Sequence, residues 1–286
     1  MTRPFHARTV SGARKTTGLV LFLLLFLAAP AAVAQGPPDT VLLEEFTWDE
    51  IRALISSGKT SVLIATAGTE QNGPHMVMGK HRYILEYTTD RIARALGNAL
   101  VAPIIDYVPE GSWEQPRGHM TKPGTITLPN DRFMTLLEHA AKSLEAGGFT
   151  DIIFIGDSGG NQNGMRDVAA KLNLEWKGTG SRAHFIGNYY EKSSEDARRY
   201  ITGLGIPEDQ IGSHAGISDT SQLMFVNAEH VRLDKRAPGG GYADSGVSGD
   251  PTKASAAIGE VVVRIKIDNA LAQIRASLAA RAPEVS

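Results

Sequence analysis

The chain has 286 residues, of which 42% are hydrophobic and 21% charged. This suits one large α/β domain or two small ones, and excludes an intrinsically disordered chain. A net charge of −2 gives no indication of nucleic-acid binding, and the lack of cysteine excludes disulfides, thiolate metal sites and cysteine nucleophiles.

Residues 1–34 are predicted to form a cleaved secretory signal peptide. Their 12-residue apolar run (18–29) leads to an Ala-x-Ala ending at Ala32 and Ala34, and four basic residues precede it: Arg3, Arg8, Arg14 and Lys15. As a helix the run spans about 18 Å, short of the ~30 Å hydrocarbon layer. The alternative is an uncleaved anchor that includes residues 30–34. Cleavage predicts an exported protein, periplasmic or secreted and free of the membrane. The mature chain would then have 25 basic and 31 acidic residues.

The mature chain alternates predicted strands and helices. Residues 35–60 form a linker and a first helix capped by Thr47. Short apolar runs predict strands at 61–67, 100–105, 151–155 and 184–186. Helices are predicted at 84–96, 130–144 (capped by Asn130 and Asp131), 165–176 and 261–278. Apolar strands alternating with helices favour an α/β fold, in which a mostly parallel sheet is covered on both faces in a three-layer α/β/α arrangement.

Four segments concentrate polar side chains that can carry chemistry. They are residues 68–81 (GTEQNGPHMVMGKH), 117–125 (RGHMTKPGT), 156–163 (GDSGGNQN) and 213–221 (SHAGISDTS). The first and third directly follow predicted strands, where sites in parallel sheets lie. Each segment alone has a structural interpretation, as a turn cap or a packed histidine. Together they favour a site whose carboxylates and imidazoles suit Zn²⁺ or Mn²⁺.

These segments resemble the creatininase (creatinine amidohydrolase) family. T-E-Q-N-G-P-H-M-x-M-G is similar to the family's T/S-E-Q-H-G-P-H-L-P-x-x-x-D, whose aspartate falls at His81, and H-M-T-K-P-G-T is similar to its H-x-x-F-P-G-T. I-G-D-S-G-G-N is similar to N-G-H-G-G-N, and H-A-G-I-S-D-T-S to H-A-G-E-x-E-T-S. The resemblance runs from about residue 61 to residue 280. It implies a creatininase-like hydrolase domain over residues 61–286, cleavage of a C–N amide bond in a small molecule, divalent cations, and a homo-oligomer, often a hexamer.

The resemblance carries over to single residues unevenly. Glu70 matches a metal-ligating glutamate, but a ligand histidine falls at Asn72, the bridging aspartate at His81, and another histidine at Ser158. Neutral imidazole offers one lone pair and cannot bridge two ions. We therefore expect one divalent ion, Zn or Mn, rather than the family's two. Its expected ligands are Glu70, His81 and either Asp157 or Asp219.

The remaining site residues follow from the same resemblance. Asp219 or His214 is expected to act as the general base, and the backbone N–H groups of Gly159 and Gly160 to stabilise an oxyanion. Ser158 completes the catalytic candidates. The expected substrate contacts are His75, His119, Gly159, Gly160 and Asn161.

Two other functions remain open. A degenerate family member would bind a small molecule in the periplasm without catalysis, an interpretation that the apolar Ile217 at a family glutamate position supports. A serine hydrolase would use Ser158 with Asp157 and a distant histidine.

Overall fold

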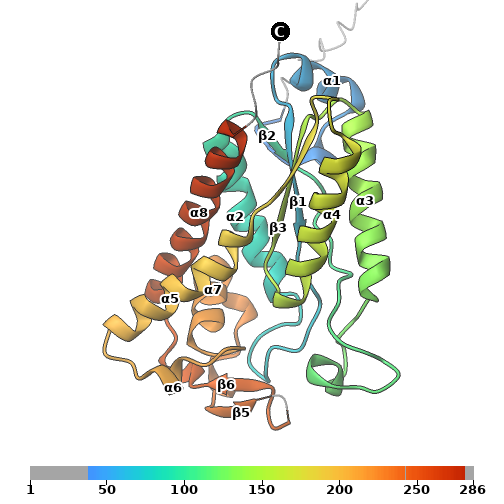
Figure 1. Ribbon diagram of the computed structural model, residues 1–286. Coiled ribbons are helices and arrows are strands. Elements are labelled where there is room, and N and C mark those ends of the chain that lie inside the picture. The colour runs from blue at the N-terminus through green and yellow to red at the C-terminus, as the bar shows by residue number, and fades with distance from the viewer. Residues whose placement is uncertain (1–37, 242, 281–286) are drawn as a thin grey trace, which may run out of the picture. The chain divides into compact units, whose positions relative to one another are not determined.

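Four parallel strands form the central sheet, in the order β2-β1-β3-β4 (Figure 1). They are β1 (Ser61–Thr66), β2 (Ala99–Val101), β3 (Asp151–Gly156) and β4 (Arg182–Phe185). This computed structural model describes residues 38–241 and 243–280, so the predicted signal peptide lies outside the described residues. Every residue of β1, β2 and β3 is buried, as expected for strands covered on both faces.

Helices cover both faces of this sheet (Figure 1). On one face pack α1 (Trp48–Ser56), α3 (Asn130–Ala146) and α4 (Gln162–Glu175). On the other pack α2 (Lys80–Leu96) and α8 (Ala256–Ala279). The predicted three-layer α/β/α fold is therefore confirmed.

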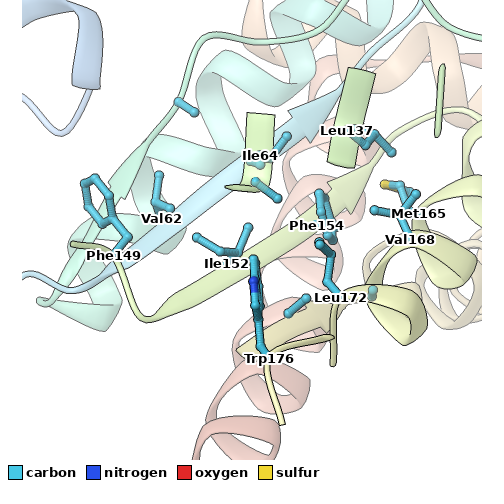
Figure 2. Close-up of a cluster of buried hydrophobic side chains, with 14 of the residues drawn as sticks. Val62, Ile64, Leu137, Phe149, Ile152, Phe154, Met165, Val168, Leu172 and Trp176 are labelled. Carbon is cyan, nitrogen blue, oxygen red and sulfur yellow. The ribbon is translucent and has the colours of Figure 1, made fainter. Parts of the chain in front are cut away.

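Alternation along the strands divides the core into two layers. Val62 and Ile64 of β1, with Ile152 and Phe154 of β3, face α3 and α4, where Figure 2 shows them beside Leu137, Met165, Val168 and Leu172. The intervening residues, Leu63, Ala65, Ile153 and Ile155, pack against α2 and α8. The period of two that separates these sets is the pleat of a β-strand.

Smaller elements surround the carboxyl ends of the strands. They comprise α5 (Glu191–Gly203), α6 (Glu208–Ile211), α7 (Ile217–Val226) and an antiparallel pair, β5 (Gly239–Gly241) and β6 (Val247–Gly249). Short 3₁₀ helices lie at η1 (Leu43–Glu45), η2 (Gly118–Thr121), η3 (Gly159–Asn161), η4 (Gly187–Tyr189), η5 (Ala228–His230), η6 (Leu233–Lys235) and η7 (Pro251–Lys253). Within the described part of the chain, no helix is long and apolar enough to span a membrane.

The helix caps differ in part from those predicted. Thr47 caps α1 in a reciprocal capping box with Glu50, as expected. The predicted caps of α3, Asn130 and Asp131, are wrong. Pro129 is the N-cap, with extended backbone (φ −56°, ψ 143°), so Asn130 is already helical.

Candidate active site

The polar segments that follow β1 and β3 lie side by side, because these strands are paired in register up to Thr66 and Gly156. Glu70 lies four residues beyond β1, and Asp157 and Ser158 directly follow β3. His81 enters from the first turn of α2, His119 from η2, and His214 from the turn before α7. Five separate parts of the chain thus meet at the carboxyl edge of the sheet.

These side chains line a cavity of about 530 Å³. Its walls include nine predicted site residues: Glu70, His81, His119, Asp157, Ser158, Gly159, Gly160, His214 and Asp219. The predicted substrate contacts His75 and Asn161 are instead completely buried in the supporting structure. His75 Nε2 lies 2.9 Å from Thr220 Oγ1, and Asn161 Nδ2 donates to the Thr66 and Ala67 carbonyls, which joins the ends of β1 and β3.

One carboxylate and two imidazoles converge in this cavity. Glu70, His119 and His214 each present one ligand atom, and these atoms all lie within 4.8 Å of one another. His119 Nε2 is 3.1 Å from Glu70 Oε2, and His214 Nδ1 is 3.7 Å from Glu70 Oε1. Among the described residues, this is the group of three that could hold a metal ion.

The backbone carbonyl of Gln71 orients both imidazoles of this group. It accepts a hydrogen bond from His214 Nε2 at 2.8 Å and another from the His119 ring. When one ring nitrogen of a histidine donates a hydrogen bond to a backbone carbonyl, the ring is oriented so that its other nitrogen can bind a metal. Burial lowers the pKa of His119, and lowers that of His214 to about 4 with help from the Lys80 charge. Both rings are therefore neutral at pH 7 and have a lone pair to offer.

His81 occupies the space between two carboxylates. Its Nε2 lies 2.8 Å from Glu70 Oε1 and its Nδ1 lies 2.7 Å from Asp157 Oδ2. Burial and the Lys80 charge oppose protonation, yet the two carboxylates raise the pKa of His81. Lys266 of α8 contacts the other Asp157 oxygen, Oδ1. The three ligands expected from the sequence, Glu70, His81 and Asp157, thus form a hydrogen-bonded chain that ends at a buried lysine.

Asp219 fixes the turn that carries His214. Its Oδ2 accepts a hydrogen bond from the Ala215 N–H at 2.8 Å, and Thr220 Oγ1 lies 3.3 Å from the Ala215 carbonyl. Both polar groups of Ala215 are therefore held from the first turn of α7. Ala215 has a φ of +50°, which is unfavourable for a residue with a Cβ and needs such support. Lys80 Nζ donates to the same Asp219 oxygen at 3.1 Å.

Ser158 and the glycines after it form another wall. The Ser158 hydroxyl donates to Glu110, a buried carboxyl whose pKa is raised to about 10 by burial and by the neighbouring Glu70 charge. Gly159 and Gly160 lie in η3, which leads directly into α4, so their peptide groups lie near the positive end of that helix. A side chain at Gly160 would collide with the Pro109 carbonyl, which explains why glycine is needed there.

Three buried charged residues of the cavity, Lys80, Glu110 and Lys266, were not predicted from the sequence. Lys266 had a detectable signal. It lies three and four residues from Val263 and Val262 and four residues before Ala270, so helical spacing alone places it on the buried face of α8. Glu110 comes from a loop without regular periodicity, and Lys80 adjoins a motif residue. The sequence pattern therefore did not mark either of them as a site residue.

Comparison with known proteins identifies the same family as the motifs. The family model described as creatininase, creatinine amidohydrolase, matches residues 44–274. A mycofactocin precursor peptide peptidase of Mycobacterium ulcerans (strain Agy99) is 27% identical over 248 residues, which cover 75% of this chain and 84% of that protein. A creatinine amidohydrolase of Pseudomonas putida is 24% identical over 203 residues, covering 68% and 75% of the two chains.

Solved creatininase structures share the fold. A manganese form superposes with a TM-score of 0.66 over 83% of this chain and 98% of that one. A mutant in a Zn–Zn form gives a TM-score of 0.67 over 84% of this chain and 99% of that one. Both are 20% identical to this sequence, so they establish the architecture.

Proposed function

Because the chain belongs to the creatininase family, we propose that it is a divalent-metal-dependent hydrolase of a C–N amide bond in a small molecule. The observation that carries the proposal is the convergence of Glu70, His119 and His214 in one cavity. The relatives support the bond type, since one is named for hydrolysis of a peptide and the other for hydrolysis of creatinine.

The donor set fits a divalent cation. A carboxylate with two neutral imidazoles is a ligand combination that zinc hydrolases use, and it leaves positions for water and substrate. Manganese accepts the same oxygen and nitrogen donors. Glu110 adds a second carboxyl beside Glu70, with one oxygen, Oε1, that is buried and lacks a hydrogen-bond partner. A cation near Glu70 would offset the Glu70 charge that raises the pKa of Glu110 and would favour the ionised form of Glu110.

When bound, such an ion supplies a water of lowered pKa and polarises a carbonyl. In the proposed reaction the Asp219 carboxylate, in the cavity wall and held ionised by Lys80, accepts the proton of the attacking water only transiently and passes it to the nitrogen that leaves when the C–N bond breaks. The N–H groups of Gly159 and Gly160 stabilise the oxyanion that forms on the carbonyl oxygen. The cavity volume of about 530 Å³ suits a compact substrate.

Substitution of the three converging residues tests this proposal. Glu70→Gln, His119→Gln and His214→Gln should each abolish hydrolysis in a panel of compact linear and cyclic amides. His139→Gln, at an exposed position of α3, is the matched control and should leave the rate unchanged. Turnover that persists in the Glu70→Gln variant, or in wild-type protein stripped by a chelator, would refute the proposal.

A second candidate function is small-molecule binding without catalysis. It is favoured because His81 and Lys80 already lie near Glu70 Oε1, at 2.8 and 3.6 Å, so a hydrogen bond and an ammonium group already satisfy that carboxylate. Under this alternative, an amide of the panel would raise the melting temperature of the protein and would be recovered intact after long incubation.

Two further properties are proposals from the sequence. Export after cleavage behind Ala34 predicts that N-terminal sequencing of the periplasmic or secreted protein begins at Gln35. Assembly into a homo-oligomer, as the family resemblance implies, is measurable by light scattering during gel filtration.

A further inference from the structure

Lys80 is a lysine in an unusual place. It begins α2, its side chain is 1% exposed, and it lies in the wall of the cavity rather than on the surface. Lysine is almost never buried to this extent unless opposite charges surround it. Here Nζ lies 3.1 Å from Asp219 Oδ2 and 3.6 Å from Glu70 Oε1, and the negative charge of Asp157 also acts on it.

Most carboxylate oxygens on this side of the cavity already have a lysine or an imidazole as a partner. Glu70 Oε1 faces Lys80 and His81. Asp157 uses Oδ1 for Lys266 and Oδ2 for His81, and Asp219 uses Oδ2 for Lys80 and for a backbone N–H. The other oxygen of Glu70, Oε2, faces His119, and His214 Nδ1 approaches Oε1 at 3.7 Å.

We propose that the Lys80 ammonium is a built-in counter-ion that takes the place a second cation would need, so that the cavity accepts one divalent ion and no more. This inference rests on the proposed function, because it assumes an ion at Glu70, His119 and His214. A metal ion on the Lys80 side would have to displace a fixed ammonium from two carboxylates. The repulsion between two cations in a site sheltered from water opposes that exchange.

Lys80 also acts as a positioning residue. Its bond to Asp219 Oδ2 holds the carboxylate that supports the Ala215 N–H, and the preceding residue is His214. Removal of the ammonium should therefore have two effects. It should free the oxygens of Glu70 and Asp219 for a second ion, and it should loosen the turn that presents His214.

Metal content tests the proposal without any substrate. Purified wild-type protein, equilibrated with excess Mn²⁺ and then freed of unbound ion, should contain one ion per chain by plasma mass spectrometry. Lys80→Met should contain two. Lys80→Arg, which keeps the charge, and Lys192→Met, which removes an exposed lysine of α5, should each contain one.

The outcomes separate this inference from the proposed function. Two ions in the wild type, or one in a folded Lys80→Met variant, would overturn the counter-ion role while leaving a metal-dependent hydrolase possible. No ion in any variant would overturn both. If Lys80→Met does not fold, the electron paramagnetic resonance spectrum of the wild type decides. An isolated Mn²⁺ hyperfine pattern is expected, and the spectrum of an exchange-coupled Mn²⁺ pair would contradict the proposal.

Discussion

Replacement of Lys266 by methionine probes the buried charges of the site most sharply. The Lys266 side chain is 7% exposed and contacts Asp157, whose side chain is 1% exposed. Removal of one member of a buried ion pair costs about 3–5 kcal/mol, because the other charge stays buried without its partner. A protein with a free energy of unfolding of about 5–15 kcal/mol would therefore lose a large share of its stability.

A double-mutant cycle isolates the interaction between the two residues. We expect Lys266→Met and Asp157→Asn each to destabilise the metal-free protein strongly in urea unfolding. The double variant should be less destabilised than the sum, with a coupling free energy of about 2–3 kcal/mol. Lys192→Met, the exposed control, should change stability by less than about 0.5 kcal/mol. Additive effects of the two buried substitutions would refute the ion pair.

The pH dependence of this coupling has a defined sign. Burial opposes ionisation, but Lys266 and His81 hold the pKa of Asp157 below its ordinary value. A carboxylate with a lowered pKa stabilises the fold fully above its unfolded pKa of about 3.9, and this stabilisation is lost as the pH falls toward the folded value. The coupling should therefore be constant at mildly acidic and neutral pH and decline below about pH 4. A coupling that already changes between pH 5 and pH 7 would contradict this assignment.

Three further predictions concern the scaffold, each measured by urea unfolding. Gly212→Ala should be strongly destabilising and should lower metal affinity, because at φ +76° a Cβ would collide with the Ser248 carbonyl beside the His214 turn. Gly58→Ala is the control, since its φ of +99° imposes the backbone strain with no atom within 4 Å. Thr47→Ala should cost about 1 kcal/mol through loss of the α1 capping box. Phe154→Ala, in the core between β3 and α4, should cost about 3–5 kcal/mol, and a loss below 1 kcal/mol would contradict its packing.

Much of the fold was predictable because its signals are local. β1 and β3 are continuous apolar runs, and the cap of α1 is encoded by Thr47 and Glu50. The prediction missed α5, whose sequence EKSSEDARRYITG buries three side chains and carries many charges, so its apolar face is narrow. The prediction that Asn130 caps α3 is wrong because the preceding Pro129 already has the extended backbone that a cap residue requires.

The segments that form the candidate site were predictable from the sequence, but the role of each side chain was less so. Strand order brings Glu70 and Asp157 together, and strand ends can be recognised in sequence. The assignment of ligands depends on where each ring nitrogen points, which is a tertiary property. His81 is turned between two carboxylates, whereas the Gln71 carbonyl turns His119 and His214 toward Glu70.

Anomalous diffraction from crystals loaded with Zn²⁺ or Mn²⁺ tests the central claim most directly. We expect one peak per chain, bonded to a Glu70 carboxylate oxygen and to one ring nitrogen each of His119 and His214, at about 2.0–2.2 Å for zinc. A peak bonded to His81 and Asp157 would contradict this ligand assignment. A map with no peak in the cavity would contradict metal-dependent hydrolysis itself.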